Sequence, residues 1–224
     1  MLISSTWGLM LLALVISGVA QMKVSSTFRK YSKVRSRKGV AACDAARRIL
    51  DYNGLTNVQI ERMRGNLTDH YDPRHKTLCL SESVYLSDSV AALGVAAHEA
   101  GHAIQDKEGY APLRMRSALV PVANFGSQIS WIMVLLGFLF SFNGLIDIGI
   151  LLFSAVVLFH LVTLPVEFNA SARALAALEG GGVLEADEAQ HTKRVLSAAA
   201  LTYVAAVLVA ILQLARLLLL RSRR

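Results

Sequence analysis

Long apolar runs separated by polar segments dominate the pattern of this sequence. Four of these runs are each long enough to cross roughly 30 Å of hydrocarbon as a helix. They cover residues 2–20, 118–140, 145–165 and 197–220. Only the turn-like residues 141–144 separate the second run from the third, which predicts a tight antiparallel helical hairpin. The two outer ends of this hairpin are therefore expected on the same side of a membrane.

The polar segment 21–117 has the periodicity of a small domain that mixes helices and strands. Apolar and small residues recur at helical spacing over 40–53 and again over 87–107, where Ser87 is a favourable N-cap. Alternating apolar and polar residues predict short strands between these helices, at 57–63 and 77–80. We therefore expect an α+β unit between the first and second membrane spans.

Composition supports a membrane protein, because 54% of the residues are hydrophobic and only 17% are charged. The net charge is +7, and the positive charges crowd directly behind the first apolar run, over residues 23–38. No aromatic side chains are interleaved with them in the manner of a nucleic-acid surface. We therefore expect a lipid bilayer as the partner of this basic segment, and no nucleic acid.

These charges also predict how the chain lies in the membrane. Residues 18–20 resemble a signal-peptide cleavage site, but the basic stretch that would precede such a peptide is missing. We therefore expect an uncleaved anchor with its N-terminus outside, which makes 21–117 and 166–196 cytoplasmic. These two segments hold 19 of the 23 Lys and Arg residues. The remaining four conflict with the positive-inside rule, and they are Arg216, Arg221, Arg223 and Arg224.

One short motif carries recognisable chemistry, the run His98-Glu99-Ala100-Gly101-His102 within the second predicted helix. His98 and His102 are four residues apart and share a helix face, so both imidazoles can bind one ion at about 2.0 to 2.1 Å. Glu99 then lies beside the ion and can take a proton from a water that the metal activates. A surface helix with two solvated histidines is the plain alternative. The apolar surroundings argue against it, because buried imidazoles need partners.

A catalytic zinc takes three protein ligands, so a third ligand is expected elsewhere in the chain. Glu167 stands out because it follows Pro165 at the end of the third run, on the side to which the hairpin returns. The residues after it can continue as a helix and would present the carboxylate rigidly. A charge at the membrane boundary is the plain alternative. The full set of candidates is His70, His75, His160, His191, Glu82, Glu108, Glu167 and Glu179.

Hydrolysis also requires a donor for the oxyanion, and the sequence does not choose among several side chains. Possible oxyanion or substrate donors are His70, Tyr71 and His191, with Tyr85 and Arg173 also chemically able. Residues 76–80 are expected either as an edge strand that receives an extended peptide or as a strand that simply packs against the metal helix.

The segments HEAGHAIQ, LPVEFNAS and LTDHYDP, together with the four-span layout, resemble the YugP-type neutral zinc metallopeptidases of bacterial membranes. More distantly they are similar to the HtpX and CAAX-prenyl-protease group of membrane gluzincins. The resemblance implies a zinc set of His98, His102 and Glu167, with Glu99 as general base. The chain departs from the wider group at Ser171, where an acidic residue often orients a ligand histidine; Asn169 or Ser171 is the expected substitute.

The expected fold class is thus a mainly α-helical integral membrane protein with about four transmembrane helices and a small α+β zincin-like catalytic domain. The expected regions are an N-terminal anchor, a catalytic region, a transmembrane hairpin, a helix with the third ligand plus a loop, and a C-terminal span with a basic tail. They cover residues 1–20, 21–117, 118–165, 166–196 and 197–224.

The expected function is a Zn²⁺-dependent metalloendopeptidase that cleaves membrane or membrane-proximal proteins at the cytoplasmic face of a bacterial plasma membrane. Its partners would be a peptide or protein substrate and the bilayer, while the oligomeric state is not predicted. The alternative is a catalytically inactive zinc-binding membrane scaffold or chaperone partner. A solute carrier is disfavoured, because the spans lack the several polar midplane groups that carriers need.

Overall fold

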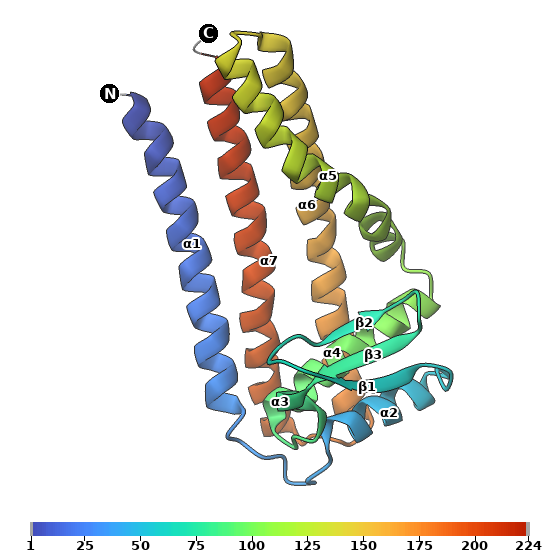
Figure 1. Cartoon of the computed structure of the whole chain (residues 1–224). Helices are drawn as coiled ribbons and strands as arrows, with labels where there is room; N and C mark the ends of the chain where they lie inside the picture. Colours follow the sequence, from blue (N-terminus) through green and yellow to red (C-terminus); the bar gives the residue numbers. More distant parts are fainter. Residues whose placement is uncertain (1, 223–224) are drawn as a thin grey trace. The chain divides into compact units, whose positions relative to one another are not determined.

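The computed structural model describes residues 2–222 and consists of two compact units (Figure 1). Met1, Arg223 and Arg224 lie outside the described residues, and with them the end of the expected basic tail. One unit is made of helices only, and the other combines helices with a small sheet. The helical unit comprises Met1–Gln21, Pro112–Pro165 and Thr202–Arg224, and the mixed unit comprises Met22–Ala111 and Val166–Leu201.

Four long helices are apolar enough to cross a membrane, which confirms the spans predicted from hydropathy. Each helix continues beyond its apolar run into polar sequence, because hydropathy marks the part that faces lipid and not the point where backbone hydrogen bonding ends. The chain is therefore an integral membrane protein. The four helices are α1 (Leu2–Tyr31), α5 (Ala111–Leu139), α6 (Asn143–Gly180) and α7 (Ala186–Arg221).

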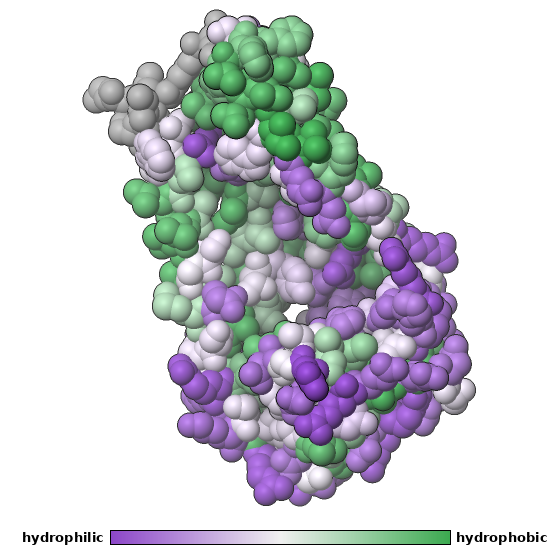
Figure 2. All heavy atoms as spheres, in the orientation of Figure 1, coloured by the Kyte–Doolittle hydropathy of each residue, from purple (hydrophilic) through white to green (hydrophobic). Residues whose placement is uncertain are grey.

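Glycines bring α5 and α6 close together in the expected hairpin. A Cβ added at Gly126 would lie 2.8 Å from the carbonyl oxygen of Leu152, and one added at Gly149 would lie 2.9 Å from that of Ser130. Close backbone approach of this kind is how membrane helices pack, since lipid provides no hydrophobic force between them. The surface over these helices is mostly apolar, whereas the mixed unit is mostly hydrophilic (Figure 2).

One arginine that conflicts with the positive-inside rule has a partner within the helical unit. The Arg221 guanidinium donates to Asp147, with Nε 2.7 Å from Oδ1. Asp147 lies near the start of α6, just after the hairpin turn. The carboxylate compensates part of the positive charge at the end of α7.

The mixed unit contains a three-stranded sheet that lies over helix α4 (Figure 1). The strand order is β1-β3-β2, with β1 parallel and β2 antiparallel to β3. The elements of this unit are α2 (Ala42–Tyr52), β1 (Gln59–Met63), β2 (His70–Asp72), β3 (Thr77–Ser81), α3 (Glu82–Tyr85) and α4 (Val90–Lys107).

The structure decides between the two alternatives for 76–80 and corrects one further expectation. The segment is not an edge strand, because β3 is paired on both sides and has no free backbone edge for a substrate; it packs against α4, as the second alternative predicts. Ser87 is not the N-cap of α4. Ser89 has that role, since its hydroxyl accepts a hydrogen bond from the Ala92 amide at 3.2 Å, while Ser87 Oγ contacts Ser89.

Helix α4 lies at the centre of the core of this unit and is buried along most of its length. Its buried positions are mainly alanine and glycine, which allow neighbouring backbones to approach closely. A Cβ at Gly94, for example, would lie 2.7 Å from Cγ2 of Thr192 on α7. The Thr192 hydroxyl donates to the Val90 carbonyl at 3.0 Å and so fixes α7 to the first turn of α4.

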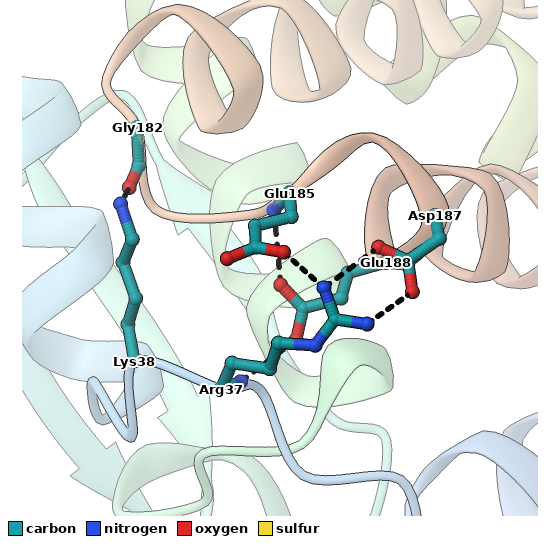
Figure 3. A network of polar contacts seen from close by, with 6 residues as sticks. All are labelled: Arg37, Lys38, Gly182, Glu185, Asp187 and Glu188. Atoms are coloured by element: carbon teal, nitrogen blue, oxygen red, sulfur yellow. Dashed lines mark hydrogen bonds and ion pairs between the residues drawn. The ribbon is translucent and has the colours of Figure 1, made fainter.

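A polar network holds the turn between α6 and α7 against the segment that precedes α2 (Figure 3). The guanidinium of Arg37 forms ion pairs with Glu185 and Asp187. The backbone amide of Arg37 donates to Glu188 Oε1 at 2.7 Å. Lys38 donates to the Gly182 carbonyl oxygen. Exposed ion pairs contribute little one at a time, but a guanidinium shared by several groups is held in one geometry. The network therefore anchors the end of α6, the helix that carries Glu167.

Candidate metal centre

Helix α4 places the two motif histidines on one face, as their spacing predicts. The rings of His98 and His102 meet edge to face, with centroids 4.7 Å apart and an interplanar angle of 84°. His102 is buried and His98 is partly buried. Both imidazoles are thus largely shielded from bulk water on one helix.

Helix α6 supplies the third group to this site. The Glu167 carboxylate is only 2% exposed, and its Oε2 lies 3.2 Å from His98 Nε2 and 3.6 Å from His102 Nε2. The donor atoms of the three residues all lie within 4.8 Å of one another. Among the residues that the structure describes, this is the group of histidines and carboxylates close enough to hold a metal ion.

The geometry and chemistry of these three groups fit zinc. Donor atoms about 2.0 to 2.1 Å from a tetrahedral ion are about 3.3 Å from one another, close to both distances between Glu167 and the histidines. Two imidazoles and one carboxylate are also the donor set of a catalytic zinc that keeps a fourth position open. A buried carboxylate between two imidazoles is therefore arranged as a Zn²⁺ site.

Gly101, inside the motif, permits the approach of α6 to α4. A Cβ at this position would lie 2.7 Å from the carbonyl oxygen of Ala170 and 3.3 Å from its Cα. These are backbone atoms of α6, which cannot rotate away as a side chain would. The absence of a side chain at Gly101 is therefore what lets Glu167, one turn before Ala170, reach the histidines.

Replacing Gly101 with alanine is accordingly expected to separate the two helices locally. We expect a loss of about 1 to 3 kcal/mol in the free energy of unfolding, because an inserted methyl group overpacks the interface. Zinc affinity should fall as well, by about tenfold or more, because the carboxylate moves away from the imidazoles. Thermal unfolding and competition with a chromophoric chelator measure the two effects.

Gly180→Ala provides the matched control, because a Cβ there has nothing within 4 Å. That variant should keep the stability and zinc affinity of the parent, since alanine is the better helix former. Equal behaviour of the Gly101 and Gly180 variants would show that the close approach is unimportant.

A buried glutamine orients the second histidine. Gln105 is fully buried, and its amide nitrogen donates to the Val166 carbonyl and to Asn169 Oδ1, both at 2.9 Å. Its amide oxygen therefore faces His102 Nδ1, 3.0 Å away, and accepts a hydrogen bond from the Nδ1–H group. With its proton on Nδ1, His102 keeps the Nε2 lone pair for a metal.

The first histidine has a hydroxyl as its corresponding partner. Ser171 Oγ lies 3.1 Å from His98 Nδ1, so the serine occupies the place where the wider group often has an acid. Asn169 acts on the other histidine, through Gln105, and its Oδ1 also accepts from Arg173 Nε at 2.7 Å. Both residues expected as substitutes thus lie around His98 and His102.

The carboxylates of Glu167 and Glu99 favour the protonated form of His102 when no metal is bound. Burial by itself lowers the pKa of the His102 imidazole, but the Glu167 carboxylate and the charge of Glu99 outweigh it, so the pKa is raised. Glu99 directly follows His98 in the chain, and its charge contributes to this raised pKa. Glu99 is partly buried, and none of the side chains that the structure describes forms a hydrogen bond with it.

The three possible donors lie in different surroundings. His70 is exposed on β2, with Nδ1 3.0 Å from the Thr68 carbonyl. Tyr71 donates its hydroxyl to Asp106 at 2.8 Å, and burial together with this carboxylate raises the pKa of the phenol. His191 packs against the ring of Tyr31 on α1, with centroids 5.1 Å apart. Their expected role as donors stays a prediction.

Most other candidates for the third ligand have partners of their own. His75 pairs with Asp72, Glu82 with Arg62 and Glu108 with Arg173. His160 lies beside Phe159 on α6, and Glu179 is exposed near the end of the same helix.

The sequence patterns did not single out Gln105 or the role of Gly101. The position of Gln105 one turn after His102, on a buried helix, was the available signal.

Comparison with known proteins agrees with a zinc-binding chain. The family model described as "Putative neutral zinc metallopeptidase" matches residues 6–222. "Putative membrane protease YugP" of Bacillus subtilis (strain 168) is 50% identical over 204 residues, which are 91% of this chain and 91% of that relative. No solved structure matches the chain. Because the family match covers nearly the whole sequence and every residue of the metal centre, this chain belongs to the neutral zinc metallopeptidase family.

Proposed function

We propose that this protein is a membrane-embedded metalloendopeptidase of the HExxH gluzincin type, which cleaves peptide bonds of membrane or membrane-proximal proteins. The observation that carries the proposal is the grouping of His98, His102 and Glu167, with Glu99 next to His98 in the chain. Three ligands leave one coordination position for a water or a substrate, whereas a structural zinc site is closed by four protein ligands.

In this proposal His98, His102 and Glu167 hold the ion, and Glu99 serves as general base. Bound Zn²⁺ would polarise the scissile carbonyl and lower the pKa of the attacking water toward about 7. Glu99 takes the proton of that water as its oxygen bonds to the carbonyl carbon. The same carboxyl group then delivers the proton to the leaving nitrogen as the C–N bond breaks.

The other residues of the centre act by positioning. Gln105 and Ser171 hold the imidazoles of His102 and His98, so that the ligand nitrogens face one point. Glu167 is 2% exposed where α4 packs closely on α6 at Gly101. One of His70, Tyr71 and His191 is proposed to stabilise the oxyanion.

The active site is proposed to face the cytoplasm at a bacterial plasma membrane. Its residues belong to 21–117 and 166–196, the segments in which most of the Lys and Arg residues lie. Loops rich in positive charge stay on the cytoplasmic side. Substrate bonds would then be cleaved close to the inner membrane surface.

Metal removal tests the proposal on the purified full chain. We expect one zinc per chain by metal analysis, loss of peptide hydrolysis after treatment with 1,10-phenanthroline, and recovery on adding stoichiometric Zn²⁺. The isomer 1,7-phenanthroline, which cannot chelate, should leave hydrolysis unchanged. A protein that binds zinc fully but cleaves no peptide or membrane protein would instead favour the scaffold alternative.

A further inference from the structure

A cavity between α1 and α7 is not explained by peptide hydrolysis. Its volume is about 730 Å³, which is within the range of small-molecule sites. None of the residues that line it belongs to the metal centre. The cavity lies wholly within the mixed unit, in the parts of α1 and α7 that follow Met22 and precede Thr202.

The cavity is strongly basic. Lys23 and Lys30 from α1 and Lys193 and Arg194 from α7 line it, and its lining contains no acid. Arg194 donates to the hydroxyl of Tyr31 at 3.1 Å, and Lys30 lies 5.4 Å from the centroid of the same ring. Within residues 2–222, none of the three lysines forms an ion pair. The positive charge is therefore uncompensated, and an anion is the complementary ligand.

Hydroxyl groups lie among these charges. Ser26 and Thr27 from α1 and Ser197 from α7 are also part of the lining. Ammonium, guanidinium and hydroxyl groups together are donors for the oxygens of a phosphate group. Gln190 adds an amide, while Ala198 and Leu201 form an apolar part of the wall, so the cavity combines a polar part suited to phosphate with an apolar part.

The position of the cavity along both helices indicates where the phosphate comes from. Lys23 is the first charged residue after the apolar run of α1, and Arg194 is the last before the uncharged stretch of α7 that reaches Arg216. In a helix that spans a membrane, this change from apolar to charged residues marks the headgroup layer. Basic pockets between helices at this level are suited to anionic lipid headgroups.

We propose that this cavity binds the phosphate headgroup of an anionic phospholipid. Lys23, Lys30, Lys193 and Arg194 neutralise the phosphate, and the acyl chains follow the apolar surface beyond Leu201. The bound lipid links α1 to α7, whose Thr192 holds the start of the metal helix. The site is independent of the proposed peptidase reaction.

The test uses the purified full chain in a neutral detergent, titrated with dioleoyl phosphatidylglycerol and followed by native mass spectrometry. The double variant Lys23→Gln/Lys193→Gln removes two lining charges. The control Arg29→Gln/Lys33→Gln removes two exposed charges of the same basic segment that do not line the cavity. We expect lipid affinity to fall at least about tenfold in the first pair and to stay within about twofold in the second.

Two further ligands separate the possible sources of the phosphate. Phosphatidylcholine should not bind. When phosphatidylglycerol saturates the site, inorganic phosphate at an equal concentration should fail to displace it. Equal weakening in both double variants, equal binding of phosphatidylcholine, or displacement by inorganic phosphate at equal concentration would each overturn the proposal.

A second variant keeps the test decisive if the first does not fold. Ser197→Glu adds an acid to the lining at an exposed position and leaves all four basic residues in place. Its zinc content and elution volume should match the parent, while phosphatidylglycerol binding is lost. Retention of full lipid affinity in this variant would show that the cavity is not the site.

Discussion

Glu99→Gln is expected to retain bound zinc while its rate of peptide hydrolysis falls by about three orders of magnitude. Glutamine has nearly the shape of glutamate but cannot accept the proton of the attacking water. Glu99 is not one of the three grouped ligands, so the affinity for the ion should stay unchanged. Metal analysis and kcat/KM on a labelled peptide measure the two properties separately.

Glu61→Gln on β1 is a suitable control, because it removes an exposed carboxylate of the same unit. It should keep both zinc and activity. In cells, a comparison of membrane-protein fragments between the parent and Glu99→Gln should identify substrates, as fragments that only the parent produces. Equal proteolysis by the two forms would remove Glu99 from the proposed mechanism.

Glu167→Gln is expected to lower zinc affinity by at least about 100-fold, because it removes a ligand and its negative charge, where loss of a supporting partner alone costs 10- to 100-fold. The Glu167 side chain is buried between His98 and His102, so no water can take over its role without rearrangement. The rate of peptide hydrolysis should fall in proportion to the fraction of protein that still holds zinc. Competition between the protein and a chromophoric chelator for Zn²⁺ gives the affinity.

The matched change Glu179→Gln lies on the same helix, where its side chain is exposed. That variant should bind zinc as the parent does. If Glu167→Gln also bound zinc normally, the third ligand would have to be sought elsewhere and the proposed centre would be wrong. Comparison with Glu99→Gln then separates a variant without metal from a variant that holds metal but lacks the base.

Some of this protein could be predicted from local sequence because the relevant physics is local. A run such as 145–165 forms a membrane helix whatever its neighbours are, since unpaired backbone groups are not tolerated in lipid. His98 and His102 likewise share a face through helix geometry alone. Family membership followed from the same motif and its sequence surroundings.

Local sequence patterns did not decide between alternatives of nearly equal quality, either for the N-cap of α4 or for the position of 76–80 in the sheet. Ser87 and Ser89 are both good caps, and only the hydrogen bond to Ala92 decided between them. The segment 76–80 has the pattern of a strand, but strand order depends on pairing with β1 and β2. Its central position decided against the edge strand and for the strand that packs on α4.

The amino-acid sequence by itself determined the four spans, the helix that presents His98 and His102 on one face, and the family. The sequence favoured Glu167 among eight candidates, but only the tertiary structure brought its carboxylate to His98 and His102, because Glu167 is 69 residues away from His98 in the chain. It also showed that Gln105 and Ser171 orient the imidazoles and that Gly101 allows α6 to reach them. Helical periodicity arises within a few residues of chain, whereas a metal centre requires two separate helices to pack at contact distance.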